Sequence, residues 1–256
     1  MKKFVLLSLI FIGLPCFAFA NESQIITENF LERLSLPSLC QGEGPGMRLT
    51  NLNGDIIQRN ATSPLPLSLE RRGEQQISVE GDSLTILPRS SWGADTPKPF
   101  AYHVPNRITV HHEGTFFDGV KETAEAHILK VQKWGMTDAR NWVDIPYHYL
   151  IDNKGRIFEG RNAYTVGETN TDYNPEGHLL ISMLGNFEEQ EVPAAQLDAL
   201  VNMIVYACMT YSIDPNTLAT HKDQTETLCP GKNLYAYFTS GYVLAEVKKR
   251  LSAEKK

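Results

Sequence analysis

The chain has 256 residues, of which 24 are Lys or Arg and 30 are Asp or Glu, so its formal net charge at pH 7 is −6. An acidic chain lacks the excess of basic groups that binding to a phosphate backbone requires, so nucleic acid is not expected as a partner. The length is sufficient for one domain with a well-filled core and a smaller additional segment.

Residues 1–20 have the pattern of a secretory signal peptide. Two lysines precede an apolar run at residues 4–14, and the small residues Ala18 and Ala20 suit a signal peptidase. The apolar run is shorter than the roughly 20 residues that a membrane-spanning helix needs, and no later stretch approaches that length. We therefore expect cleavage near Ala20 and a mature protein that is periplasmic or secreted. Cleavage removes two lysines and no acidic residue, which leaves a formal charge of −8.

Residues 21–85 differ in composition from the rest of the chain. Their apolar residues are sparse and irregularly spaced around the Gly- and Pro-containing stretches QGEGPG and TSPLPL. This pattern indicates an N-terminal extension, partly irregular, with at most a short helix at ENFLERLSL and a hairpin at NLNGD. Regular patterning begins after Leu84, so residues 86–256 are expected to form the main domain.

Strand patterns and helix patterns alternate from residue 86 onward. The expected strands are rich in β-branched and apolar residues: RITVHH, the two arms of YHYLIDNKGRIFEGR around a turn at Asn153-Lys154-Gly155, HLLISMLGNF and the short LATHKD. The expected helices have apolar residues at helical spacing: DGVKETAEAHILKVQKWG, VPAAQLDALVNMIVYACMTYSI, and LYAYFTSGYVLAEVKKRL with an interruption at Gly241. The sequence therefore predicts an α/β fold in which a central mixed β-sheet is flanked by helices.

Three residues at expected strand ends or loops are candidates for a metal site. His111 closes the strand ITVHH, and His221 and Cys229 occur with seven residues between them in THKDQTETLCPG. A catalytic zinc ion needs three such donors and leaves one position open. Spacing alone leaves the alternatives open, because a His-His pair at a strand end is more often packed or exposed, and Cys229 could instead be half of a disulfide.

The cysteine count of the mature chain is odd. Cys40, Cys208 and Cys229 remain after removal of Cys16, so at least one thiol has no intramolecular disulfide partner. A metal-bound thiolate would account for one of them. Cys40 and Cys208 are then equally compatible with a disulfide or with a buried free thiol at Cys208. Lipidation at Cys16 is disfavoured, because Pro15 is not the small residue that such processing prefers.

Four segments in order, LPRSSWGA, ITVHHEG, NWVDIPYHYLIDNKGRIFEGR and HKDQTETLCPG, resemble the zinc-dependent N-acetylmuramoyl-L-alanine amidases of the type 2 group. That group includes the peptidoglycan recognition proteins and the bacteriophage lysozyme-type amidases. The resemblance covers residues 86–252 and leaves the extension uncovered. It implies a peptidoglycan substrate, made of a glycan strand and a stem peptide, and one Zn²⁺ cofactor.

The resemblance also implies roles for individual residues. The zinc ligands are His111, His221 and Cys229, while Tyr147 lies beside the metal and Thr227 occupies a position where relatives have Thr or Lys. Zinc lowers the pKa of bound water towards about 7 and polarises a carbonyl group. Tyr147 and Thr227 are therefore expected to be catalytic, each donating a hydrogen bond as the oxyanion forms.

Substrate-binding residues are expected around this centre. His112 borders the cleft, and Asn174 lies in TVGETNTDYNPEG, a segment that departs from the usual V-G-A-H-T pattern of the family. The pair Asn141-Trp142 combines the Gly-Trp that relatives use with diaminopimelate and the Asn-Phe they use with lysine, so it does not decide the third residue of the stem peptide. Arg140 could meet a peptide carboxylate, although an exposed Arg more often meets water.

Several other polar residues are not assigned to catalysis. Glu113 and Glu168 are possible proton carriers, but solvated acids on a loop or strand edge are more common. Glu159 is expected to accept hydrogen bonds from the backbone or from Arg161, and His127 to be a packed or half-exposed histidine on its helix.

The sequence favours an exported zinc amidase, a monomer, that cuts the bond between N-acetylmuramic acid and L-alanine. A binding-only module is the first alternative, but such relatives typically lack the cysteine ligand that Cys229 provides. A zinc peptidase or amidase with a substrate outside the wall is the second alternative.

Overall fold

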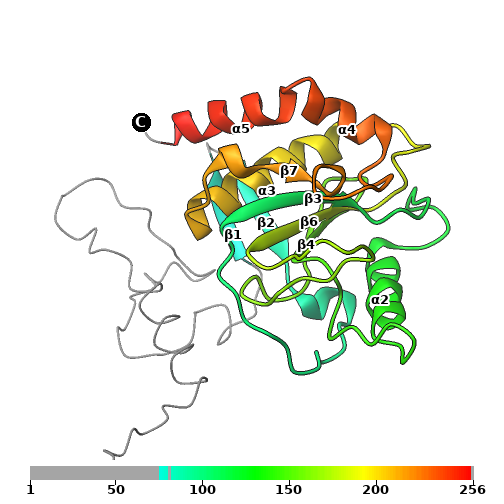
Figure 1. Cartoon of the computed structure of the whole chain (residues 1–256). Helices are drawn as coiled ribbons and strands as arrows, with labels where there is room; N and C mark the ends of the chain where they lie inside the picture. The colour runs from blue at the N-terminus through cyan, green and yellow to red at the C-terminus, as the bar shows by residue number, and fades with distance from the viewer. Residues whose placement is uncertain (1–74, 80–81, 255–256) are drawn as a thin grey trace, which may run out of the picture. The chain divides into compact units, whose positions relative to one another are not determined.

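A seven-stranded sheet is the centre of this computed structural model, which describes residues 75–79 and 82–254 (Figure 1). These residues all belong to one compact unit, Arg48–Lys256. The strands are β1 (Gln75–Val79), β2 (Asp82–Leu87), β3 (Arg107–His112), β4 (Tyr149–Ile151), β5 (Ile157–Glu159), β6 (His178–Met183) and β7 (Ala219–Thr220). The helices are α2 (Ala124–Gly135), α3 (Ala194–Tyr211), α4 (Lys232–Thr239) and α5 (Tyr242–Ala253), with 3-10 turns η2 (Arg89–Trp92), η3 (Pro215–Thr217) and η4 (His221–Asp223).

The strand order is β1-β2-β5-β4-β6-β3-β7. The pairs β1–β2 and β4–β5 are antiparallel, whereas β2–β5, β4–β6, β3–β6 and β3–β7 are parallel. The predicted mixed sheet flanked by helices is therefore confirmed. Strands β1 and β2 begin before residue 86, so the sheet includes part of the range expected to be the extension.

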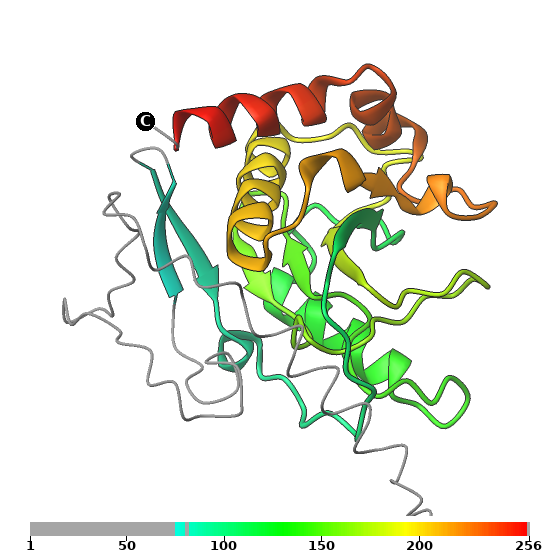
Figure 2. The same cartoon turned by 60° about the vertical axis from the view of Figure 1, so that its left-hand side comes forward.

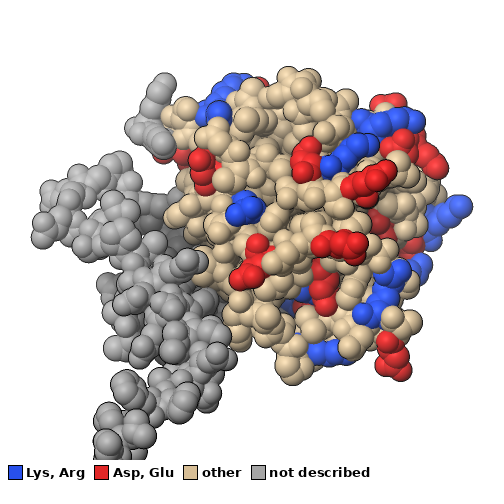
Figure 3. Space-filling view, viewed as in Figure 1, with Lys and Arg blue, Asp and Glu red and all other residues tan. Residues whose placement is uncertain are grey.

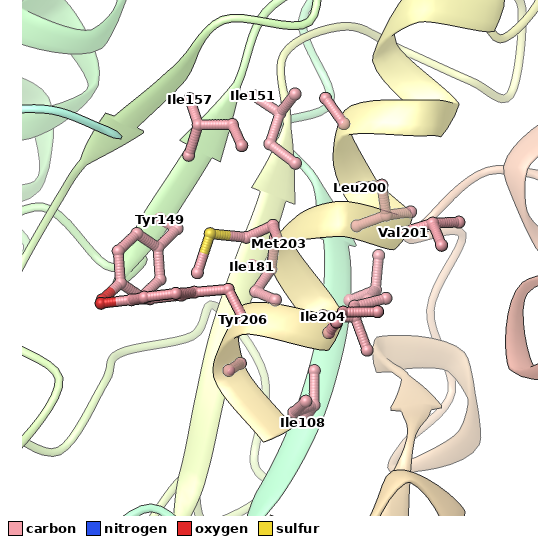
Figure 4. Packing of buried hydrophobic residues seen from close by; sticks show 14 of the residues in the cluster. Ile108, Tyr149, Ile151, Ile157, Ile181, Leu200, Val201, Met203, Ile204 and Tyr206 are labelled. Carbon is pink, nitrogen blue, oxygen red and sulfur yellow. The ribbon is translucent and has the colours of Figure 1, made fainter. Parts of the chain in front are cut away.

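The central strands of the sheet are buried on both faces, and their side chains alternate between two hydrophobic clusters. Ile151 and Ile157 belong to the cluster that includes the apolar face of α3, whereas Leu150 and Phe158 belong to the cluster that includes Ile128 of α2. Figure 4 shows the first cluster, in which the sheet residues lie against α3. Figure 2 shows α3 between the sheet and α5. The period-two alternation of a strand thus gives one core to each face.

The apolar face that the sequence predicts for helix α3 is buried in the structure. Pro193 is its N-cap residue, and the predicted face is buried along its length: Leu197, Leu200, Val201, Ile204, Val205 and Cys208. Cys208 is a free thiol, and burial raises its pKa to about 11. Cys40 lies outside the described residues.

The last expected helix is two helices. Helix α4 ends at Thr239 and α5 begins at Tyr242, with Gly241 between them at a φ of 76°. A left-handed residue cannot continue an α-helix, so the glycine produces a complete break rather than a mild interruption.

Several expectations concern parts of the chain outside the described residues. These are the signal peptide at residues 1–20, the short helix ENFLERLSL and the hairpin NLNGD. Within the part of the chain that the structure describes, no helix is long and apolar enough to cross a membrane. Basic and acidic side chains are interspersed on the face seen in Figure 3, without a continuous basic surface there.

Candidate metal centre

Strand β3 sends its two terminal histidines to opposite faces of the sheet. Ile108 and Val110 pack in the cluster with α3, so His112 also faces that side and His111 faces the other. His112 accepts a hydrogen bond at Nδ1 from the backbone N–H of Phe187 at 3.2 Å. The adjacent histidines therefore have different surroundings, and His111 is the one that meets the other candidate ligands.

His221 comes next to His111 through the pairing of β3 with β7. Val110 is the partner of Thr220 in the parallel register, so the residues that follow each of them lie at the same edge of the sheet. The imidazole centroids of His111 and His221 are 4.6 Å apart. A capping box fixes the start of η4: the Asp223 carboxylate accepts the backbone N–H of Thr220 at 2.7 Å, and the Thr220 side chain accepts the backbone N–H of Asp223.

Cys229 completes the cluster from the loop after η4. Its Sγ lies 3.7 Å from Nδ1 of His111 and accepts the backbone N–H of His112 at 3.3 Å. The three candidate ligand atoms lie within 4.8 Å of one another. Donors that bind one tetrahedral zinc at about 2.0–2.3 Å are roughly 3.3–3.8 Å apart, so the cluster has the size and chemistry of a zinc site with three protein ligands.

The protonation of the three groups is consistent with this fit. Burial holds the pKa of His111 well below its ordinary value, and the nearby His221 adds to this effect. Burial likewise lowers the pKa of His221 to about 4. Both imidazoles are neutral at pH 7, as metal ligands must be. Burial also raises the pKa of Cys229 to about 12, so a cation is needed to hold this thiol as a thiolate.

Tyr147 and Thr227 lie beside the three ligand residues. The Tyr147 ring is 5.4 Å from the His111 ring, centroid to centroid, and its hydroxyl lies 3.5 Å from the carbonyl oxygen of His112. Burial, then the nearby Cys229 and Glu113, raise the pKa of Tyr147 well above its ordinary value, so the phenol stays protonated. Thr227 accepts the backbone N–H of Cys229 at 3.2 Å.

A cleft of about 760 Å³ opens over this centre. Among the residues predicted to bind substrate, His112 and Trp142 line it. Asn141 and Asn174 are not among its lining residues. The side chain of Asn141 accepts from Lys98 Nζ at 3.1 Å, and that of Asn174 accepts the backbone N–H of Glu176 at 3.0 Å.

The acids left unassigned, Glu113 and Glu168, are partly buried and have hydrogen-bond partners. Glu113 accepts from His127 at 2.9 Å, and the other nitrogen of His127 bonds to Glu122 at 2.8 Å. Glu168 pairs with the buried Arg161 and accepts the backbone N–H of Val143 at 3.1 Å. The expectation of packing for His127 is confirmed, since it is 4% exposed.

The other expectation concerned Glu159. This carboxylate accepts a backbone N–H, that of Arg89 at 3.3 Å, while the side chain of Arg161 pairs with Glu168 instead.

Two hydroxyl groups at the centre were not anticipated. Thr171 Oγ1 lies 2.7 Å from Nε2 of His221, and the Tyr173 hydroxyl lies 3.3 Å from Nε2 of His111. Both residues lie in TVGETNTDYNPEG, and the departure of this segment from the family pattern was the sequence feature that could have indicated them.

Comparison with known proteins identifies the family. The model of the N-acetylmuramoyl-L-alanine amidase family matches residues 101–232. Peptidoglycan-recognition protein SD of Drosophila simulans is 30% identical over 170 residues, which are 64% of this chain and 89% of that protein.

Solved structures show the same similarity. Peptidoglycan recognition protein-LE, in complex with tracheal cytotoxin, a monomeric diaminopimelic acid-type peptidoglycan, is 28% identical with a TM-score of 0.55. The match covers 60% of this chain and 92% of that one. Human PGRP-IBETAC, in complex with glycosamyl muramyl pentapeptide, is 26% identical with a TM-score of 0.54, over 60% and 94% of the two chains. With its fold and its family model in agreement, the chain belongs to the N-acetylmuramoyl-L-alanine amidase family.

Proposed function

We propose that the protein is a zinc-dependent amidase of peptidoglycan that acts in the periplasm or outside the cell, after cleavage of its signal near Ala20. Its reaction is hydrolysis of the amide between N-acetylmuramic acid and the L-alanine of the stem peptide. The observation that carries this proposal is the convergence of His111, His221 and Cys229 within 4.8 Å on the wall of one cleft.

The residues of the cleft supply the remaining parts of an amide hydrolysis. A zinc ion held by His111, His221 and Cys229 would act as a Lewis acid, activating water and polarising the scissile carbonyl. Tyr147, kept protonated by burial, is placed to donate a hydrogen bond to the carbonyl oxygen as its negative charge develops. The Thr227 oxygen already accepts a backbone N–H, which leaves the hydroxyl proton available as a second donor.

Peptidoglycan is the favoured substrate because one solved relative holds a monomeric diaminopimelic acid-type peptidoglycan and another holds a glycosamyl muramyl pentapeptide. The cleft is large enough for a peptide stem, and Trp142 and His112 on its walls are the proposed substrate contacts. Asn141 and Asn174 do not line the cleft, and we propose that they contact parts of the substrate that extend outside it.

A binding-only module is the second candidate, since peptidoglycan-recognition protein SD and peptidoglycan recognition protein-LE are recognition proteins by name. The buried thiol of Cys229 beside two neutral imidazoles favours the enzyme, because a module that merely binds sugars and peptides has no need of a metal donor set.

A comparison of two cysteine variants tests the proposal. Cys208 and Cys229 are both buried free thiols. Cys229 lines the cleft, whereas Cys208 belongs to the hydrophobic core on α3. We expect the wild type and Cys208→Ser to hold about one zinc per chain and to release stem peptides with a free L-alanine amine from intact peptidoglycan, detected by mass spectrometry. Cys229→Ser should lose zinc and activity while remaining folded.

The same assay distinguishes the alternatives. Binding of the wall without cleavage by the zinc-loaded wild type would identify a recognition module. Cleavage of free peptides or of proteins, but not of the muramyl amide, would identify a peptidase.

A further inference from the structure

The loop at residues 168–173 places a hydroxyl group at Nε2 of each of the two candidate histidine ligands. Thr171 Oγ1 is 2.7 Å from Nε2 of His221, and the Tyr173 hydroxyl is 3.3 Å from Nε2 of His111. On His111, it is Nδ1 that lies 3.7 Å from the sulfur of Cys229. His111 therefore has Nε2 against a hydroxyl group and Nδ1 beside the Cys229 sulfur, and His221 has Nε2 against a hydroxyl group.

These contacts determine which tautomer can bind a metal. A neutral imidazole has one N–H donor and one lone-pair nitrogen, and only the lone pair can bind a cation. If the hydroxyl accepts the Nε2–H, Nδ1 has the lone pair. The outer hydrogen bond thus selects the ligating nitrogen and the ring orientation.

The hydroxyl of Thr171 has a hydrogen-bond arrangement that suits the accepting role. Its own proton can go to Thr169 Oγ1, 3.4 Å away, because Thr169 in turn donates to the carbonyl oxygen of Thr171 at 3.0 Å. The Thr171 oxygen is then left as an acceptor for the Nε2–H of His221.

The loop that holds these hydroxyls is fastened at two points before Thr171. Glu168 is paired with the buried Arg161 and accepts the Val143 N–H. Asn170 accepts a hydrogen bond from Arg140. A loop fixed at both residues holds the following hydroxyl with little freedom, which is the condition for orienting a ligand.

The side chain of Arg140 is itself held by an aromatic ring. Its guanidinium stacks on Trp134 at 3.6 Å from the ring centroid. Arg140 therefore links Asn170 to the last turn of α2, where Trp134 lies.

We propose that Thr171 and Tyr173 are positioning residues that present Nδ1 of His221 and Nδ1 of His111 to the zinc ion. This inference rests on the proposed function, because it concerns the same metal centre. It adds that metal affinity depends on two hydroxyl groups that do not touch the metal.

Zinc affinity is the direct readout, measured by competition with a chromophoric chelator on the full mature chain. We expect Thr171→Val and Tyr173→Phe each to weaken zinc binding about 10–100-fold, the usual effect of removing the outer partner of a ligating histidine. Thr171→Ser, which keeps the hydroxyl, should bind zinc nearly as the wild type does. Thr239→Val and Tyr242→Phe on α4 and α5 are matched controls and should leave affinity unchanged.

The stability of the metal-free proteins distinguishes a positioning role of Thr171 and Tyr173 from a purely structural role. The thermal unfolding midpoints of metal-free wild type, Thr171→Val and Tyr173→Phe should coincide, and Thr171→Ala replaces the valine variant if that one does not fold. Wild-type zinc affinity in the hydroxyl-deleted variants overturns the inference while leaving the amidase proposal intact. Absence of zinc binding by the wild type overturns both.

Discussion

Tyr147 lies beside the candidate ligands and presents a phenol that burial keeps protonated. We expect Tyr147→Phe to lower kcat about 10²–10³-fold, the usual effect of losing one oxyanion donor, with zinc content unchanged. Because the pKa of Tyr147 is raised, activity should not decline through its ionisation near pH 10. Steady-state kinetics on peptidoglycan fragments measure this. A rise in KM with unchanged kcat would instead assign Tyr147 to ground-state binding.

His127 makes a pH-dependent contribution to stability through its two carboxylate partners. Burial disfavours its charged form, but hydrogen bonds to Glu113 and Glu122 outweigh burial and raise its pKa. A raised folded-state pKa means stabilisation that is complete below the unfolded value, about 6.5, and is lost as pH rises through the folded value.

The comparison of wild type with His127→Gln tests this contribution. The difference in free energy of unfolding should be about 1–3 kcal/mol at pH 5.5 and should shrink as the pH rises through the folded-state pKa. Urea unfolding at a series of pH values measures it. A difference that grows with pH contradicts the charged pairing.

At the scale of elements, Gly231 joins the Cys229 loop to α4 at a position where any side chain would be strained. Its φ is 87°, and a Cβ there would lie 2.2 Å from the Phe187 carbonyl carbon. We expect Gly231→Ala to destabilise the protein by about 3 kcal/mol or more. Gly241→Ala is the control, since its φ is 76° with nothing within 4 Å, and should cost about 1 kcal/mol. Denaturant unfolding compares them, and equal losses would mean that the close contact is relieved by loop movement.

The periodic elements were predictable and the long-range pairings were not. Strand β3, the β4–β5 hairpin and helix α3 have strong local patterns, and the structure confirms them. Helix α2 begins at Ala124, later than the pattern suggested, because Thr123 caps it by accepting from the backbone N–H of Ala126. The pairing of β2 with β5 depends on contacts distant in sequence, which no local pattern encodes.

The candidate site was predictable in part for a similar reason. The positions of His111, His221 and Cys229 followed from resemblance, since spacing alone left a disulfide or a packed histidine open. Thr171 and Tyr173 lie in an irregular loop, where the direction of a side chain depends on tertiary contacts such as the bond of Asn170 to Arg140.

For the whole molecule, two hydrophobic clusters on opposite faces of the sheet provide the core without any metal. We expect chelation to abolish activity yet leave a cooperative unfolding transition. Free zinc at about 100 times its Kd would add roughly 2.7 kcal/mol to the stability of the folded state. Calorimetry with and without chelator measures this increment. Loss of cooperative unfolding on chelation would show that zinc is required for folding.

The separation of the candidate ligands along the chain has a consequence for biosynthesis. His111 and Cys229 are 118 positions apart, and His221 reaches them through the pairing of β7 with β3. The donor set therefore does not exist on a nascent or partly folded chain, because it forms when the two ends of the domain have met. For zinc bound as proposed, loading of this centre follows folding, so the zinc content of a preparation counts the molecules that have both folded and taken up the metal.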